Sequence, residues 1–380
     1  MLIDIRDNDN IYVGCGSATP SFLLNKLLET KANNVKVYQL LPFGNLNYLK
    51  NTNVSHISLF NSNVNRKYIN KNKNFMPVHF SQIPKLIKSK KISINVVFLE
   101  VSEEDENGFH SLGMSVECLP SAIDVAERII VCVNKNVPKT IGYRIHKDKI
   151  TQFFQSNNLL NLYEESNHLR TEEKEVADRV AEIIPSGSTI QTGVGSIPSL
   201  VLNRLHNKEN LSLHTECLFD SAIGLLESQV AKNAICTLAL GGNNLVKYIN
   251  ENKKVQFMPV EFVNDPNIIA SKNIYAINSA ISVDFLGQAC SDSIGKDIYS
   301  GFGGIVDFMR GASYGDGLSI LALTSKTKCG KLKFLKKISS PVTLTRADVD
   351  VIITENGLVD LRGTTIKQRS YLIKKVAGIK

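Results

Sequence analysis

One short stretch contains an imidazole, a carboxylate and a thiol within four residues. Residues 211–217 read Leu-Ser-Leu-His-Thr-Glu-Cys, and their alternation predicts a half-buried strand that ends at a carboxylate. Glu216 is a candidate catalytic carboxylate, although most glutamates are solvated surface groups. Cys217 could be a thiol nucleophile, but no suitably placed histidine and asparagine accompany it, so a buried inert thiol is preferred. His214 alone is more typical of a hydrogen-bonded structural histidine than of a catalytic base.

Two glycine turns could bring backbone close to a ligand. Gly14-x-Gly16 and Gly193-x-Gly195 each follow a short apolar run and precede a helical pattern, as in phosphate-binding turns of open parallel sheets. Both lack the third glycine of a dinucleotide fingerprint, which argues against a dehydrogenase, and the missing Gly-Lys-Ser/Thr excludes a P-loop. Each turn is therefore either a tight strand-to-helix connection or a backbone that approaches a phosphate or pantetheine chain.

A third segment holds three glycines in four residues, Gly301, Gly303 and Gly304. Glycines leave backbone N–H groups unhindered and permit positive φ, so this loop could form an anion nest or an oxyanion hole. The alternative is a flexible surface loop. The apolar neighbours and the pair formed by Asp307 and Arg310, three residues apart, favour a packed loop.

Internal repeats indicate the elements that must hold these turns. Three segments of the first part of the chain recur in the same order in the second, at offsets of 179, 182 and 179 residues. The matched positions are Gly14 with Gly193, Pro77 with Pro259, and Asp105 with Asp284. We therefore expect two related halves, residues 1–170 and 171–380, with the polar segment 138–170 as the connection between them.

Helical and strand patterns alternate within each half. In the second half, Thr171 is a plausible N-cap, the helix ends at Pro185-Ser-Gly187, residues 189–192 form a strand, and Pro198 begins the next helix. Further short apolar strands are predicted at 95–99, 129–133, 274–277, 320–323 and 349–353. This alternation predicts an α/β fold of two related open halves produced by tandem duplication, with mostly parallel sheets and flanking helices.

Composition narrows the function classes. The 380 residues are 43% hydrophobic and 21% charged, which is ordinary for a soluble globular protein. The net charge of +8 comes from scattered bases, so we read it as compositional bias and expect no nucleic-acid partner.

The seven cysteines form no Cys-x-x-Cys pair and the histidines no metal-binding spacing, so we expect reduced thiols and no metal. No run approaches a membrane span and the N-terminus carries acids, so we expect no membrane association and a cytoplasmic location.

Taken in order, these motifs resemble the acetyl-CoA hydrolase/transferase family, especially its branch of 4-hydroxybutyrate and butyrate CoA-transferases. The resemblance runs over most of the chain, at residues 102–113, 193–195, 214–216, 277–281, 284–288, 301–308, 345–348 and 354–363. It implies that the glutamate of the His-x-Glu motif, here Glu216, forms a covalent thioester with coenzyme A. A related subfamily places its glutamate at the position of Ser282, which leaves Glu216 as the candidate.

The resemblance also implies a coenzyme A site and its substrates. The residues implied to line it are Gly193, Val194, Gly195, Ser196, Ile197, Ile281 and Gly304, and the Gly303 and Gly304 amides could stabilise an oxyanion. Acyl-CoA and a short-chain carboxylate (acetate, butyrate or 4-hydroxybutyrate) would be substrates, coenzyme A would not be bound permanently, and a homodimer is expected. Because Glu216 must be deprotonated to attack, we expect burial to raise its pKa only slightly. The alternatives are an acyl-CoA hydrolase, such as an acetyl-CoA hydrolase, on the same fold and a catalytically degenerate CoA-binding relative.

Overall fold

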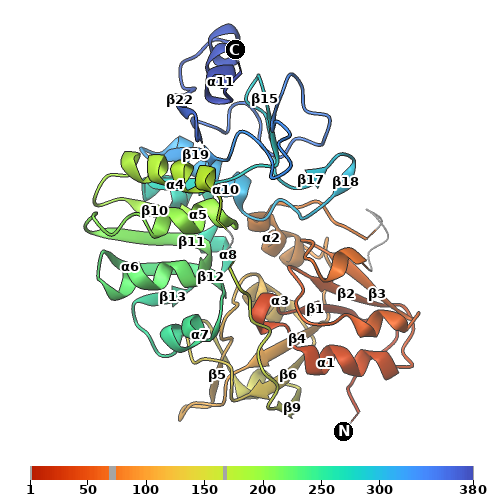
Figure 1. Cartoon of the computed structure of the whole chain (residues 1–380). Coiled ribbons are helices and arrows are strands. Elements are labelled where there is room, and N and C mark those ends of the chain that lie inside the picture. Colours follow the sequence, from red (N-terminus) through yellow and green to blue (C-terminus); the bar gives the residue numbers. More distant parts are fainter. Residues whose placement is uncertain (1, 68–73, 166–168, 380) are drawn as a thin grey trace. The chain divides into compact units, whose positions relative to one another are not determined.

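The computed structural model describes residues 2–67, 74–165 and 169–379 (Figure 1). Its contacts divide the chain into two compact units. Unit 1 comprises residues 1–163, 237–261 and 299–301, and unit 2 comprises residues 164–236, 262–298 and 302–380. The chain passes between the units inside strand β12 (Ala231–Leu240) and inside helix α8 (Val260–Val263).

Unit 1 is built on a six-stranded sheet in which every neighbouring pair is parallel. From edge to edge its strands are β3 (Val54–Ser58), β2 (Val35–Gln39), β1 (Asn10–Val13), β4 (Val96–Val101), β6 (Arg128–Asn134) and β9 (Gln152–Ser156). The helices of this unit are α1 (Ser21–Lys26), α2 (Ile83–Lys88), α3 (Leu119–Val125) and α7 (Asn243–Ile249). Short pairs also form between β5 (Phe109–Ser111) and β8 (Arg144–His146) and between β7 (Ile141–Gly142) and β13 (Val255–Phe257).

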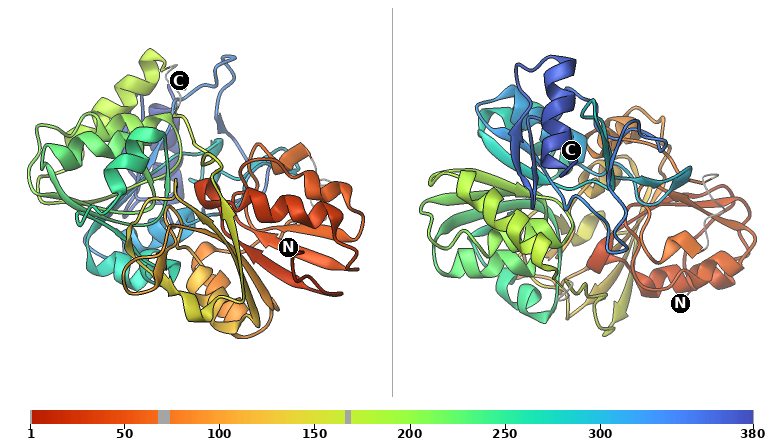
Figure 2. Two further views of the ribbon diagram at one scale, coloured as in Figure 1. Left: turned by 90° about the horizontal axis from the view of Figure 1, so that it is seen from below. Right: turned by 45° about the horizontal axis from the view of Figure 1, so that its top comes forward.

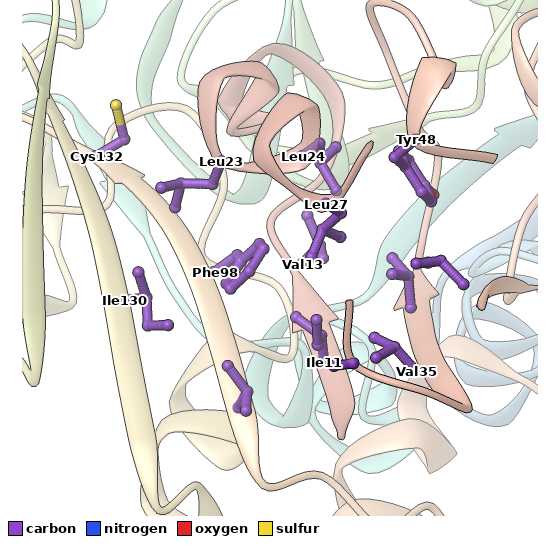
Figure 3. Packing of buried hydrophobic residues seen from close by; sticks show 14 of the residues in the cluster. Ile11, Val13, Leu23, Leu24, Leu27, Val35, Tyr48, Phe98, Ile130 and Cys132 are labelled. Carbon is purple, nitrogen blue, oxygen red and sulfur yellow. The ribbon is translucent and has the colours of Figure 1, made fainter. Parts of the chain in front are cut away.

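One core cluster of unit 1 lies between this sheet and helix α1. Leu23, Leu24 and the C-cap residue Leu27 pack over Val13 and Phe98 of the central strands, and all five side chains are fully buried (Figure 3). Truncating a buried aromatic such as Phe98 to alanine costs about 3–5 kcal/mol in cores of this kind. Two further views show α1, in red, against the strands that it covers (Figure 2). This packing fixes the strand ends from which the first glycine turn leaves.

Unit 2 is built on a second sheet whose neighbouring strands from Leu211–Phe219 across to Val351–Thr354 pair in parallel. Its order is β22 (Gly357–Asp360), β21 (Val351–Thr354), β19 (Leu318–Ala322), β14 (Ile274–Asn278), β10 (Thr189–Thr192), β11 (Leu211–Phe219) and then β12, with β22 antiparallel to β21. The helices are α4 (Thr171–Ile183), α5 (Ser196–Leu202), α6 (Ile223–Glu227), α9 (Pro266–Ser271), α10 (Ile305–Tyr314) and α11 (Ile366–Val376). Short strands β15 (Ser282–Asp284), β16 (Ala289–Cys290) and β20 (Phe334–Leu335) pair together, as do β17 (Ser293–Ile294) and β18 (Asp297–Ile298).

The two sheets share one topology. In each, the first strand of the sheet has the second and then the third strand on one side, and the fourth, fifth and sixth on the other. Gly14 directly follows β1 and Gly193 directly follows β10, so the matched glycines occupy the same place in both sheets. The predicted α/β class with two related, mostly parallel sheets is therefore confirmed.

Three local expectations need correction. Segment 138–170 is more than a connection, because it contains β7, β8 and the edge strand β9 of the unit 1 sheet. Thr171 is the first residue of α4 and not its cap, since the Arg170 N–H already donates to Glu173 Oε2 at 2.9 Å. Strand β11 continues through Phe219, so Glu216 lies inside the strand and not at its end. Within the described ranges, no helix has the length and apolarity needed to cross a membrane.

Candidate active site

Glu216 lies in β11 of unit 2, which pairs in parallel with β10. Neighbouring residues of a strand point to opposite faces, so Glu216 shares its face with His214 while Cys217 points the other way. Cys217 is 4% exposed, in keeping with the buried thiol that we preferred, whereas Glu216 keeps part of its surface open. The strand therefore presents the carboxylate, and not the thiol, as the accessible group.

Two groups from distant parts of the chain touch this carboxylate. The Asn264 Nδ2 atom donates a hydrogen bond to Glu216 Oε2 at 2.9 Å. Gly304, the N-cap residue of α10, lies so close that a Cβ built on it would be 2.2 Å from Glu216 Oε2 and 2.2 Å from Asn264 Nδ2. Only glycine fits at this position without displacing the carboxylate or its amide partner.

The surroundings of Glu216 raise its pKa to about 7. Burial is the largest cause, the Asn264 hydrogen bond opposes it, the negative charge of Asp307 adds to the increase, and the Gly304 amide lowers the pKa. Our expectation of a small shift is therefore wrong, because none of these neighbours supplies a positive charge. A carboxylate with this pKa is partly ionised near neutral pH, and its higher basicity makes the ionised form a better nucleophile.

His214 serves as a support for this arrangement. Its Nε2 atom lies 2.8 Å from the Val263 carbonyl oxygen, so this nitrogen donates, and its Nδ1 atom lies 3.0 Å from Lys272 Nζ and accepts. Burial is the main reason that its pKa falls to about 4, so the ring is neutral at pH 7. Because Val263 directly precedes Asn264, the histidine holds the segment that supplies the amide to Glu216. The structural interpretation of His214 is confirmed.

The second glycine turn begins next to the segment of β11 that carries Glu216. Thr215 Oγ1 donates to the carbonyl oxygen of Thr192, the last residue of β10, at 3.0 Å. Gly193 follows, its N–H bonded to the Ile277 carbonyl at 2.9 Å, and a Cβ there would lie 2.5 Å from Asn278 Oδ1. Gly195 has φ +142, and the Val194 side chain is 59% exposed. The turn thus presents open backbone and an apolar side chain.

The other residues predicted to line the coenzyme A site differ in burial and in hydrogen bonding. Ser196 Oγ donates to Glu173 Oε1 at 2.8 Å, and Ile197 is buried in α5. Ile281 is half-buried in the turn between β14 and β15, where its N–H bonds to the Cys290 carbonyl at 2.8 Å. Gly303 has φ +52 and leads into Gly304. Among the predicted site residues, Gly304 directly contacts Glu216.

The loop around Gly303 and Gly304 is packed at the start of α10. Arg310 Nε donates to Asp348 Oδ1 at 3.0 Å, and the negative charge of Asp307 also acts on Arg310. Asp307 is buried in the first turn of α10, where its charge acts on Glu216 as well. Helix α10 starts immediately after Gly304, which excludes the flexible-loop alternative at this end of the segment.

Asn264 contacts the candidate carboxylate, and the sequence did not indicate it. It is completely buried, and its Oδ1 atom has no hydrogen-bond partner among the described residues. Residues 262–265 read Phe-Val-Asn-Asp, a sequence with no distinctive spacing relative to Glu216, 48 positions earlier. Across the described ranges, histidine, cysteine, aspartate and glutamate side chains form no cluster of three or more suited to a metal ion.

Models of one protein family match both parts of the chain. Residues 2–159 match the model of the acetyl-CoA hydrolase/transferase N-terminal domain, and residues 241–378 match that of the C-terminal domain. The 4-hydroxybutyrate coenzyme A transferase of Clostridium kluyveri is 31% identical over 98% of this chain and 92% of that protein. Other relatives are also CoA transferases. An acetyl-CoA hydrolase of Candida albicans is 34% identical over 48% of this chain and 37% of that protein.

A solved structure extends the similarity to the whole fold. The crystal structure of RipA from Yersinia pestis superposes with a TM-score of 0.91 at 26% sequence identity. The superposition covers 98% of this chain and 91% of that one. The similarity is therefore not confined to the motifs around one site.

Proposed function

Because the chain belongs to the acetyl-CoA hydrolase/transferase family, we propose that it is a CoA-transferase that moves coenzyme A between short-chain carboxylic acids through a thioester on Glu216. The observation that carries this proposal is the Glu216 carboxylate held between the Asn264 amide and the Gly304 backbone. Acyl-CoA and a free carboxylate are the two substrates, and coenzyme A leaves with the product. No nucleotide is consumed because one thioester is exchanged for another.

The first half-reaction transfers coenzyme A to the enzyme. A Glu216 carboxylate oxygen attacks the acyl-CoA carbonyl, the carbon–sulfur bond breaks, and a glutamyl–acyl anhydride and a thiolate result. The thiolate then attacks the glutamyl carbonyl of the anhydride and releases the free acid, which leaves coenzyme A bonded to Glu216. A second carboxylate reverses these two steps and departs as the new acyl-CoA, which regenerates the Glu216 carboxylate.

Each addition step produces a tetrahedral oxyanion that needs hydrogen-bond donors. The Gly303 and Gly304 amides lie at the start of α10, where the helix dipole also favours negative charge. A preorganised donor of this kind is worth about 3–4 kcal/mol in the transition state. The Asn264 amide keeps one carboxylate oxygen occupied, which orients the other toward an incoming carbonyl.

The exposed turn at residues 193–197 is the proposed contact for coenzyme A in this scheme. Its backbone can approach the pantetheine chain because Gly193 and Gly195 carry no side chain, and Val194 offers an apolar surface. Ile281 and the Gly303–Gly304 segment complete the proposed site.

A trapping experiment tests the covalent step. The protein is incubated with butyryl-CoA, treated with borohydride, digested with trypsin and examined by mass spectrometry. Reduction of a thioester converts the Glu216 side chain to an alcohol, so the peptide that contains residue 216 should change mass only when acyl-CoA was present. An unmodified peptide from enzyme that turns over would rule out the thioester at this position.

The hydrolase alternative is favoured by the similarity to an acetyl-CoA hydrolase. Both activities begin with the same thioester, and they differ in whether water or a carboxylate attacks it. Coenzyme A release from butyryl-CoA is therefore measured with and without acetate while acetyl-CoA is quantified. A transferase forms acetyl-CoA and releases little free coenzyme A, whereas a hydrolase releases coenzyme A at the same rate without acetate.

A further inference from the structure

Residues 325–333 of unit 2 form a short hairpin that is rich in lysine, and we call it the lysine hairpin. Its arms meet at a bridge between Lys326 and Leu332, and the Lys333 N–H donates to the Ser325 carbonyl oxygen at 2.9 Å. The exposed lysines of the hairpin are Lys326, Lys328 and Lys331, and Lys333 is half-buried. The hairpin therefore concentrates positive charge in one short segment.

The lysine hairpin lies at the same edge of the unit 2 sheet as the turn at residues 193–197. Strands β10, β14 and β19 are parallel neighbours, so their carboxyl ends meet at one edge. The turn follows β10 directly, and the hairpin begins two residues after the end of β19. The Val283 N–H, two residues beyond Ile281, donates to the Lys333 carbonyl oxygen at 3.0 Å. Open α/β sheets bind their ligands at this edge.

Glu173 of α4 connects the glycine turn with the start of the lysine hairpin. Its Oε1 atom accepts a hydrogen bond from Ser196 Oγ at 2.8 Å, and its Oε2 atom accepts from the Arg170 N–H at 2.9 Å. The Arg170 Nη2 atom in turn donates to Thr324 Oγ1, directly before the hairpin, at 2.9 Å. The turn and the hairpin are thus joined through contacts within unit 2.

The charges of the lysine hairpin act on this connection. Burial would raise the pKa of Glu173, but its hydrogen bonds and the charges of Arg170 and Lys328 hold that pKa below its usual value. Burial lowers the pKa of Lys333, the charge of Arg170 adds to the decrease, and Glu173 and Glu355 oppose it. Positive groups from α4 and from the hairpin therefore face the same small region.

The two nearby acids are already engaged and leave the hairpin lysines unpaired. Glu173 is hydrogen-bonded as described above, and Glu355 accepts from the Ser325 N–H at 2.9 Å and from the Ser325 hydroxyl. Across the described ranges, none of the hairpin ammonium groups has a hydrogen bond or an ion pair. Like charges this close repel one another, and a bound anion of several charges would offset the repulsion.

We propose that the lysine hairpin binds the phosphate groups of coenzyme A, while the turn at residues 193–197 contacts the pantetheine chain. This inference rests on the proposed function, because it assigns the charged end of the substrate named there. Coenzyme A carries a diphosphate and a ribose phosphate at one end and its thiol at the other. Lysines are suited to the phosphates as point charges, and the open glycine backbone is suited to the thiol arm.

Equilibrium binding of coenzyme A is the central test, because it needs no turnover. Lys328→Gln and Lys331→Gln should each raise the Kd about 10-fold, the loss expected for one charge-assisted hydrogen bond. Lys333→Met removes the charge but keeps the half-buried stem, and should raise the Kd by a similar factor. Lys232→Gln is the matched control. It removes an exposed lysine of β12, which three strands separate from β19, and should bind as wild type.

Truncated ligands identify the end of coenzyme A that the hairpin contacts. Dephospho-coenzyme A, which lacks the ribose phosphate, should bind the wild-type protein more weakly than coenzyme A, and the hairpin variants should narrow that difference. Pantetheine lacks every phosphate and should bind the wild-type protein and the variants alike. Inorganic tripolyphosphate should bind far more weakly than coenzyme A, and equal affinity would show a general polyanion site and overturn the proposal.

Steady-state kinetics give a second readout. The phosphates are remote from the reacting thioester, so the hairpin variants should raise KM for butyryl-CoA about 10-fold and change kcat less than about twofold. Added salt should weaken binding in the wild-type protein more than in the variants, because fewer charges are paired in the variants.

Cys329 at the tip of the hairpin provides a local probe. It is exposed, whereas the other cysteines are buried. Acetyl-CoA, which has no free thiol, should slow the modification of Cys329 by a maleimide, measured by mass spectrometry of the tryptic peptide. The protection should persist in Glu216→Gln, because binding of the phosphates does not require the thioester.

The outcomes separate this inference from the proposed function. Unchanged Kd values in folded Lys328→Gln, Lys331→Gln and Lys333→Met proteins would overturn the phosphate site, as would an equal loss of affinity in Lys232→Gln. If these variants bind normally and the wild-type protein forms the thioester, the phosphate site alone fails. If no thioester forms but acetyl-CoA still protects Cys329, the proposed function fails and the phosphate site is supported.

Discussion

The glycine turn after β1 is buried inside unit 1, whereas the corresponding turn after β10 is open to solvent. All residues from Gly14 to Pro20 are buried, and a Cβ on Gly16 would lie 2.7 Å from the Leu240 side chain of the same unit. Val194 in the second turn is 59% exposed, and a Cβ on Gly195 would meet nothing closer than Pro198 Cδ at 3.8 Å. The first turn is packed against neighbouring side chains, whereas the second leaves its backbone exposed.

The strands next to the two glycine turns, β2 in unit 1 and β11 in unit 2, also differ in polarity at a matched position. Ile11 pairs with Val37, and Ile190, at the matched position, pairs with Leu213. Three residues further along the chain, the matched positions are Leu40, which directly follows β2 in unit 1, and Glu216, which lies within β11 of unit 2. Leu40 is 4% exposed and apolar, so the matched position is part of a core in one unit and holds the proposed nucleophile in the other. Under the proposed function, the same local topology contributes stability in one unit and chemistry in the other.

The largest expected effect on activity comes from substitutions at the matched positions Glu216 and Leu40. Glu216→Gln keeps the shape but cannot form an anhydride, so kcat should fall by about 10⁴-fold and the trapped thioester should vanish. Leu40→Met conserves volume, costs less than about 1.5 kcal/mol, and should leave kcat unchanged. Equal activity losses in both variants, measured with butyryl-CoA and acetate, would end the distinction between the two copies.

A second comparison is between two glycines. Gly304 contacts the Glu216 carboxylate, whereas Gly224 lies in helix α6. Gly304→Ala places a methyl group on Glu216 and Asn264 and should lower kcat about 100-fold. Gly224→Ala in α6 is the control, because its Cβ would be 3.4 Å from His206 Cε1 and alanine favours a helix by about 1 kcal/mol. Full activity in Gly304→Ala would show that this contact does not matter.

The two glycine turns should respond differently to alanine. Both positions have positive φ, at +55 for Gly16 and +142 for Gly195, so backbone strain lowers stability in each variant. Gly16→Ala adds a clash with Leu240 and should lower the free energy of unfolding by about 1–3 kcal/mol more, with KM for acyl-CoA unchanged. Gly195→Ala should instead raise KM several-fold. Urea unfolding and kinetics on both variants check this, and the reversed pattern would contradict it.

The smallest expected effect concerns pH. Because the attacking group must be ionised and its pKa is raised to about 7, kcat/KM should increase as pH rises through about 7 and then level off. Asp307→Asn removes a negative charge that raises this pKa, so the midpoint should move to lower pH by up to about 1 unit. A shift of the pH–rate profile to higher pH would show that Asp307 acts in another way.

The sequence predicted much of the fold because the repeated motifs lie where strands end. Apolar runs at 129–133 and 274–277 correspond to β6 and β14, and the strand at 189–192 has the predicted bounds. The edge strand β9 was missed because only one of its residues, Phe154 in Gln-Phe-Phe-Gln-Ser, is buried. An edge strand needs less apolar sequence than a central one, so hydrophobic pattern alone identifies it poorly.

Fewer of the site residues than of the strands could be predicted from the sequence. Glu216 was one weak candidate among many carboxylates until the family resemblance selected it. Asn264 and the Asp348 partner of Arg310 are 48 and 38 residues from the groups that they bind, and only the folded sheet brings them together. The raised pKa of Glu216 was missed for the same reason, since it depends on neighbours that local sequence does not contain.

The path of the chain through β12 has a consequence for dissecting the protein. A fragment that ends near residue 170 contains the first copy of the repeat but lacks residues 237–261, which pack with it, and a cut at the unit boundary divides β12. Neither copy can be expressed alone with its full set of contacts. The two compact units are therefore interleaved along the sequence, so a single cut cannot yield either of them as a continuous module.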